Sequence, residues 1–245
     1  MALFLDLDGT LIDIAPTPDA VHVPPELVDI LSTLSARLGG ALACVSGRAY
    51  GELVQLIGRS GVALVGSHGA ELLQPAVPDP RIAQLAQQCR LALQPWPRTL
   101  VEQKPRGLAL HWRLAPAAEG AVRALGAQLA QQLATHQLKD GKSVLELVPL
   151  AASKGSALRA LMQQPPWRGR RPVFIGDDFT DISAMQAARA LGGQAIAVGP
   201  RVAEHADAVF DSPAQVLAWL QQQCKQAPMG PAMGDAQRAG PMANP

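Results

Sequence analysis

Two aspartates two residues apart stand near the amino terminus, directly after a short apolar run. They are Asp6 and Asp8, in the stretch Asp6-Leu7-Asp8-Gly9-Thr10. The apolar residues 2–5 are typical of a strand buried on both faces of a parallel sheet, and open α/β sheets bind ligands beyond the carboxyl ends of their strands. We therefore expect a nucleophilic carboxylate, a second acid and a cation site at this edge. Taken alone, the pattern would fit an acidic turn equally well.

Three more carboxylates follow a second predicted strand, over 173–175. These are Asp177, Asp178 and Asp181. At the same sheet edge as the first pair they would repel one another strongly without a cation, and such a set of oxygens suits Mg²⁺. Asp177 is the best candidate ligand because it follows the strand most directly. Asp181 could instead begin a helix, and Asp178 could be a solvated turn residue.

Two further sites could bind an anion. Ser46 and Gly47 follow the apolar run 41–45 and offer a hydroxyl and backbone donors, although a serine N-cap is the simpler alternative. Lys154 opens a helix predicted over 155–162, where its charge is unfavourable unless an anion offsets the helix dipole. A bound phosphate would be that anion; a solvated lysine is the alternative.

The order of predicted elements indicates two domains. Apolar strand-like runs alternate with helical patterns at both ends of the chain, which predicts a parallel sheet with helices on both faces. The middle reads helix, two strands, helix, two strands, so we expect an inserted α+β (αββαββ) cap over the mouth of a Rossmann-like α/β core. The predicted boundaries are 1–77 and 150–224 for the core, 78–149 for the cap and 225–245 for a disordered tail rich in Pro, Gly, Met and Ala.

Composition excludes several classes of protein. The chain has 245 residues and a net charge of +1, so it can bury a core but has no overall field for nucleic acid or an anionic membrane. No apolar run reaches the length of a membrane span, and no signal peptide is apparent. Three scattered cysteines argue against a disulfide framework and favour the reducing cytoplasm. The oligomeric state stays open, with a monomer as the simplest expectation.

In order and spacing these elements resemble the haloacid dehalogenase-like phosphatase superfamily. Its four motifs are matched in turn by Asp6-Leu7-Asp8-Gly9-Thr10, by Ser46, by Lys154, and by Gly176-Asp177-Asp178 with Asp181. The resemblance implies that Asp6 attacks phosphorus and forms an aspartyl-phosphate, while Asp8 protonates the leaving alcohol and then activates water. It implies Mg²⁺ held by Asp6, the backbone carbonyl of Asp8, and Asp177. Ser46, followed by Gly47, and Lys154 would hold the phosphoryl oxygens.

Within the superfamily, the position of the cap and several short segments resemble trehalose-6-phosphate phosphatases over about Leu3 to Phe210. The segments are Gly66-Ser67-His68-Gly69-Ala70-Glu71, Val101-Glu102-Gln103-Lys104, Leu110-His111-Trp112-Arg113, Glu146-Leu147-Val148-Pro149 and Lys154-Gly155-Ser156-Ala157-Leu158. This resemblance implies hydrolysis of trehalose 6-phosphate to trehalose and inorganic phosphate in trehalose biosynthesis. Lys104 and Glu146 of the cap would bind the sugar, with Arg48 assisting from the core. The alternative for the cap charges is a set of surface ion pairs.

Other functions stay open at this point. The chain could be a phosphatase of the same class acting on sucrose 6-phosphate or a glycosyl-phosphoglycerate, a phosphomutase, or a non-catalytic binding domain. The family often continues its fourth motif as Thr-Asp-Glu, whereas Ile182 follows Asp181 here, which leaves the expected metal ligands intact. We also expect the cap to open and close over the site, because the core alone would leave the phosphate exposed to water.

Overall fold

The structure is a computed structural model that describes residues 1–17 and 20–225. Helix α7 (Pro213–Lys225) ends at Lys225, one residue inside the predicted tail, and the rest of that tail, residues 226–245, lies outside the described residues. Among the described residues, every helix is too short or too polar to cross a membrane.

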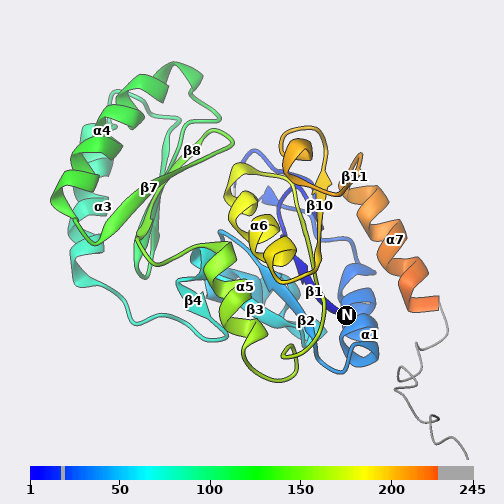
Figure 1. The fold of residues 1–245 in the computed structure, drawn as a ribbon. Coiled ribbons are helices and arrows are strands. Elements are labelled where there is room, and N and C mark those ends of the chain that lie inside the picture. The colour runs from blue at the N-terminus through cyan, green and yellow to red at the C-terminus, as the bar shows by residue number, and fades with distance from the viewer. Residues whose placement is uncertain (18–19, 226–245) are drawn as a thin grey trace, which may run out of the picture.

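The larger sheet has seven strands in the order β11-β10-β9-β1-β2-β3-β4 (Figure 1). Its strands are β1 (Ala2–Leu5), β2 (Leu42–Val45), β3 (Ala63–Gly66), β4 (Glu71–Leu72), β9 (Pro172–Gly176), β10 (Gln194–Val198) and β11 (Ala208–Phe210). All neighbours run parallel except β3 and β4, which confirms the predicted parallel core. The antiparallel edge strand β4 was not expected, because two residues leave no periodic pattern.

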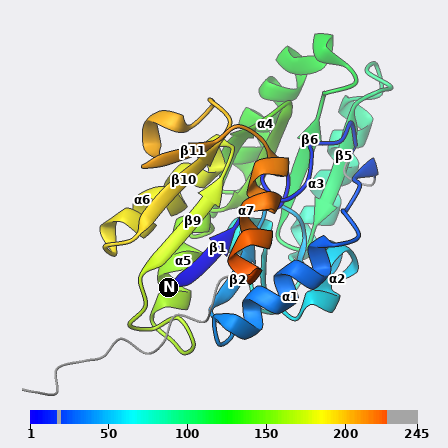
Figure 2. The same ribbon diagram turned by 90° about the vertical axis from the view of Figure 1, so that its right-hand side faces the viewer.

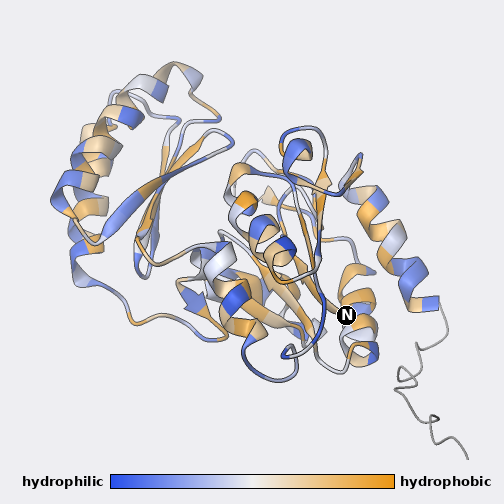
Figure 3. Cartoon of the chain, in the orientation of Figure 1, coloured by the Kyte–Doolittle hydropathy of each residue, from blue (hydrophilic) through white to orange (hydrophobic). Residues whose placement is uncertain are grey.

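Helices cover both faces of this sheet (Figure 2). Helices α1 (Leu27–Arg37), α2 (Tyr50–Ile57) and α7 pack on one face, and α5 (Lys154–Met162) and α6 (Ile182–Ala190) pack on the other. Strand β1 serves both cores, since Leu3 and Leu5 join the first cluster and Ala2 and Phe4 the second. Hydrophobic residues accordingly dominate the central strands (Figure 3). Burial on both faces explains the continuous apolar run that precedes Asp6.

The second sheet is antiparallel, with the strand order β5-β6-β8-β7. It comprises β5 (Leu100–Lys104), β6 (Gly107–His111), β7 (His136–Gly141) and β8 (Val144–Pro149), with helices α3 (Pro80–Ala92) and α4 (Glu119–Gln132) on one face. The order α3-β5-β6-α4-β7-β8 is the predicted αββαββ block. Its domain boundaries at 78 and 149 stay a prediction.

The cap sheet lies between its own helices and the core (Figure 1). Side chains alternate along each strand: Leu108 and Leu110 of β6 pack in the apolar cluster with α3 and α4, whereas Lys104 of β5 and Glu146 of β8 line a pocket between cap and core. Short 3₁₀ turns complete the described elements: η2 (Gly58–Ser60), η3 (Ser67–Gly69), η4 (Pro116–Ala118), η5 (Phe179–Asp181) and η6 (Ala203–His205).

Candidate active site

The predicted residues of the core converge on one pocket at the carboxyl edge of the parallel sheet. Asp6 follows β1, Ser46 follows β2, Asp177 follows β9, and Lys154 begins α5. All four line the same pocket as Lys104 and several other charged residues of the cap. The strand order explains the convergence, because β9, β1 and β2 are neighbours in the sheet.

Lys154 is buried between two carboxylates. Its Nζ lies 2.7 Å from Oδ1 of Asp6 and donates to Oδ1 of Asp181 at 2.6 Å. Burial alone would lower the pKa of Lys154, but Asp181 and Asp6 raise it, so the ammonium stays charged. The alternative of a solvated lysine is therefore wrong, since only 2% of Lys154 is exposed. A fixed positive charge beside Asp6 is what a phosphoryl-binding site requires.

Asp181 is a buried carboxylate that holds neighbouring residues of the site in place. It is fully buried, and its Oδ2 accepts hydrogen bonds from the backbone N–H groups of Asp177 and Asp178 at 3.0 and 2.9 Å. With Lys154 on its other oxygen, the carboxylate is engaged on both sides. Asp181 therefore fixes the loop after β9, a role that its position at the start of α6 did not reveal.

Three carboxylates could hold a cation. Asp6, Asp177 and Asp181 each offer an oxygen, and these oxygens lie within 4.8 Å of one another. Burial, and then the Asp181 carboxylate, raise the pKa of Asp6 well above its usual range and that of Asp177 to about 7. A small cation that prefers oxygen ligands would relieve this repulsion. Because Asp181 is already engaged, Asp6 and Asp177 are the carboxylates left to bind it.

Gly9 makes room for the Asp177 carboxylate. A Cβ atom at Gly9 would lie 2.2 Å from Oδ2 of Asp177. The φ angle of Gly9 is +83°, a backbone conformation that residues other than glycine rarely adopt. The hydroxyl of Thr10 donates to Oδ1 of Asp177 at 3.5 Å. The turn after β1 thus brings Asp177 against the loop that carries Asp6 and Asp8.

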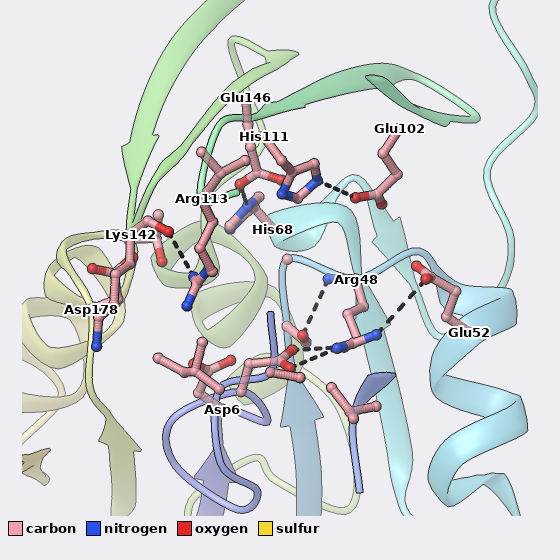
Figure 4. Close-up of a pocket in the computed structure, with 18 of the residues that line it drawn as sticks. Asp6, Arg48, Glu52, His68, Glu102, His111, Arg113, Lys142, Glu146 and Asp178 are labelled. Carbon is pink, nitrogen blue, oxygen red and sulfur yellow. Dashed lines mark hydrogen bonds and ion pairs between the residues drawn. The ribbon is translucent and has the colours of Figure 1, made fainter. Parts of the chain in front are cut away.

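Ser46 and Arg48 line another part of the same pocket. Ser46 does not cap α2, whose N-cap residue is Ala49; its Oγ accepts a hydrogen bond from the Arg48 N–H at 3.2 Å. The guanidinium of Arg48 donates to both carboxylate oxygens of Asp8, from Nε and from Nη2, each at 2.7 Å (Figure 4). The side chain expected to assist the sugar therefore orients Asp8 in this structure.

The cap residues predicted to bind the sugar do not form a surface ion-pair network. Lys104 and Glu146 are only 5% and 6% exposed. The Lys104 ammonium donates to the backbone carbonyl of Gly47 at 2.6 Å, contacts Glu146 and lies 3.7 Å from Glu102. Glu102 in turn is 2.8 Å from Nε2 of His111. Lys104 therefore ties the cap to the core beside the predicted phosphate site.

Two polar residues that the sequence analysis did not assign to the site also shape the pocket. His68 of η3 contacts Glu146 of the cap; its segment was noted only for its resemblance to the family. Arg113, whose segment was also noted for its resemblance to the family, donates from Nη2 to the backbone carbonyl of Lys142 at 2.8 Å, and both residues line the pocket (Figure 4). Contacts between residues far apart in the sequence leave no local pattern, so the sequence could not identify them.

Comparisons with known proteins agree with this architecture. The trehalose-phosphatase family model matches residues 4–210. The chain is 41% identical over 213 residues to a probable trehalose-phosphate phosphatase of Sinorhizobium fredii, covering 82% of this chain and 78% of that protein. It is 36% identical over 227 residues to the trehalose-6-phosphate phosphatase of Escherichia coli, covering 90% and 85%.

A solved structure shares the fold. The C-terminal domain of the Candida albicans trehalose-6-phosphate phosphatase superposes with a TM-score of 0.78 over 91% of each chain, at 23% identity. A haloacid dehalogenase-like hydrolase from Bacteroides thetaiotaomicron gives a TM-score of 0.64 at 17% identity, so the architecture persists where sequence similarity is low. With a family model that spans the core motifs and the cap, the chain belongs to the trehalose-phosphatase family.

Proposed function

We propose that this protein hydrolyses trehalose 6-phosphate to trehalose and inorganic phosphate, as a cytoplasmic enzyme of trehalose biosynthesis. The observation that carries the proposal is the pocket itself. It joins Asp6, Asp8 and Lys154 at the sheet edge to a wall of buried cap charges. A sugar with many hydroxyl groups needs such paired donors and acceptors, and the names of the relatives identify which sugar phosphate to test first.

The chemistry follows from the positions of three side chains. One carboxylate oxygen of Asp6 attacks phosphorus, the bond from phosphorus to the sugar oxygen breaks, and Asp8 gives that oxygen its proton. Asp8 then takes a proton from water, which attacks the phosphorus of the aspartyl-phosphate and frees Asp6. Lys154 and the Ser46 hydroxyl would stabilise the charge on the phosphoryl oxygens throughout.

A divalent cation fits the clustered carboxylates of this pocket. Asp6 and Asp177, with the backbone carbonyl of Asp8, would hold Mg²⁺, which would neutralise the charge of the phosphoryl group and keep both carboxylates ionised. Support for this assignment comes from the clustered oxygens and from the raised pKa values of Asp6 and Asp177, which arise from burial and then from the neighbouring Asp181 carboxylate.

The sugar would lie between cap and core. Lys104 and Glu146 would bind its hydroxyl groups from the cap, and Arg48 would reach it from the core while holding Asp8. With these groups buried in the docked arrangement, the cap must move for substrate to enter.

Phosphate release from a panel of sugar phosphates tests the proposal. We expect trehalose 6-phosphate to have the highest kcat/KM, above sucrose 6-phosphate and glycosyl-phosphoglycerate, with activity lost in EDTA and restored by Mg²⁺. D177N should need at least about tenfold more Mg²⁺ for half-maximal rate, because it removes a charged ligand. Preference for another sugar phosphate, accumulation of an isomeric sugar phosphate, or full activity in EDTA would contradict it.

A further inference from the structure

His68 is a buried side chain of the pocket that the proposed phosphoryl chemistry does not use. We propose that His68 is a positioning residue: its imidazole holds the sugar-binding carboxylate of Glu146 in place against the phosphate loop, defined here as residues Ser46, Gly47 and Arg48. The inference rests on the proposed function, since it assigns His68 a part in selecting the sugar rather than in the transfer of phosphate.

The backbone of η3 is held in an unusual conformation. Ser67 and His68 have φ angles of 48° and 55°, so two successive residues other than glycine lie in the left-handed region, which is costly. The phosphate loop enforces this shape: Ser67 N–H donates to the Arg48 carbonyl at 2.7 Å, and His68 N–H donates to the Ser46 carbonyl at 3.0 Å. Such strain persists where the surroundings over-determine it, and it concentrates at functional sites.

This backbone shape aims the imidazole at the cap. His68 is 3% exposed, and its Nε2 contacts Oε2 of Glu146, which lies on β8 (Figure 4). The other oxygen of Glu146 contacts the Lys104 ammonium, which itself donates to the Gly47 carbonyl at 2.6 Å. The Glu146 carboxylate is thus held from the core by His68 and from the cap by Lys104, and both holders also contact the phosphate loop.

The protonation states are consistent with this holding role. A carboxylate only accepts hydrogen bonds, so Nε2 of His68 is the donor. Burial lowers the pKa of His68 even though Glu146 opposes this. The Lys104 ammonium, together with the hydrogen bonds from His68 and Lys104, holds the pKa of Glu146 well below its usual range despite burial. A neutral imidazole therefore donates to an ionised Glu146.

The second ring nitrogen supports the assignment. Nδ1 of His68 is buried, and no hydrogen-bond partner for it is present in the described parts of the chain. Buried polar atoms without partners are rare. The ring is therefore placed so that Nε2 contacts Glu146, although this leaves Nδ1 without a hydrogen bond among the described residues. A histidine that only fills space is not expected to adopt this arrangement.

Gly47 leaves the space that the His68 imidazole occupies. A Cβ atom at this position would lie 2.7 Å from both Cε1 and Nε2 of His68. Any side chain at 47 would push the imidazole away from Glu146. The glycine of the phosphate loop is thus required by the ring that packs on it, in addition to any part its backbone plays toward phosphate.

Two substrates separate positioning from a merely structural role. Trehalose 6-phosphate needs Glu146, whereas p-nitrophenyl phosphate has no sugar for it to bind. For H68A we expect kcat/KM with trehalose 6-phosphate to fall about tenfold to a hundredfold more than kcat/KM with p-nitrophenyl phosphate, the range for losing a hydrogen bond to a charged group. H68Q, whose amide can donate near the position of Nε2, should recover part of the loss.

A double-mutant cycle and a matched control complete the test. H68A/E146Q should be no worse with trehalose 6-phosphate than E146Q alone, because both changes remove one unit. H136A removes a buried histidine of the cap that bonds to the Arg106 carbonyl and should affect both substrates alike. Equal losses of H68A on both substrates, or additive losses in the cycle, would overturn the inference. A wild type that prefers another sugar phosphate would overturn only the substrate assignment, and the His68 comparison is then made with that compound.

Discussion

Arg48 and Asp8 form a two-point ion pair at the wall of the pocket. Nε of Arg48 lies 2.7 Å from Oδ2 of Asp8, and Nη2 lies 2.7 Å from Oδ1. This fork geometry fixes the plane of a carboxylate as well as its position. Both oxygens of Asp8 accept hydrogen bonds in this pair, so it holds Asp8 in the form that takes a proton from water in the second step. The guanidinium thereby sets where that carboxylate lies beside the phosphoryl site.

Replacing Arg48 by lysine tests this geometry. R48K keeps the charge but cannot make two parallel hydrogen bonds. We expect kcat to fall about tenfold or more with both trehalose 6-phosphate and p-nitrophenyl phosphate, because both pass through the same aspartyl-phosphate, whose hydrolysis needs a well-placed Asp8 as base. Steady-state kinetics on both substrates provides the measurement. R123K is the control, because Arg123 forms an exposed ion pair with Glu119. A loss confined to the KM of the sugar substrate would show that Arg48 acts on the sugar alone.

Lys154 should matter for stability as well as for activity. K154M would leave the buried carboxylates of Asp6 and Asp181 without their shared cation, and breaking a buried ion pair costs about 3–5 kcal/mol. Chemical unfolding should show this loss in the free energy of unfolding. K154M/D181N should regain stability without regaining phosphatase activity, because the lysine that binds the phosphoryl group is still missing. A single variant as stable as the wild type would contradict the buried charge network.

A lysine of the cap should give a pH-dependent contribution to stability. Lys139 on β7 donates to the backbone carbonyl of Ala152 at 2.8 Å, and burial lowers its pKa from 10.5 to about 8. Between these two pH values the unfolded chain retains a proton on Lys139 that the folded protein has lost. The free energy of unfolding should therefore rise with pH across this interval.

K139M isolates that contribution. Urea unfolding from pH 7.5 to 10 should show the wild type gaining about 1–2 kcal/mol relative to K139M, after allowance for solvent screening. K225M changes an exposed lysine at the end of α7 and should follow the wild-type slope. Parallel curves for the wild type and K139M would mean that Lys139 keeps an ordinary pKa in the folded protein.

The sequence predicted the core of the site because local signals and sheet geometry coincide there. A buried strand precedes Asp6, Ser46 and Asp177 in each case, and neighbouring parallel strands bring their carboxyl ends together. The αββαββ order of the cap was also readable from the sequence, since each element has its own periodicity. These parts depend on contacts within an element or between adjacent strands.

The rest depends on contacts that leave no periodic pattern. Lys104 contacts the carbonyl of Gly47, which lies 57 positions earlier in the sequence. His68 contacts Glu146, which lies 78 positions later. The left-handed turn at Ser67 and His68 has no glycine at those positions to indicate it. Asp181 could be read as an ordinary helix-initiating carboxylate because its partner, Lys154, comes 27 residues earlier. Only the folded arrangement assigns these residues.

Identification of the residue that receives the phosphoryl group is the most direct test of the account. D8N should slow the second step, so the enzyme is mixed with trehalose 6-phosphate and Mg²⁺, quenched in acid within one turnover and analysed by peptide mass spectrometry. We predict phosphate on the peptide that contains Asp6, and none when Asp6 is also changed to Asn. Phosphate on any other residue, or undiminished turnover in the single variant D6N, would contradict it.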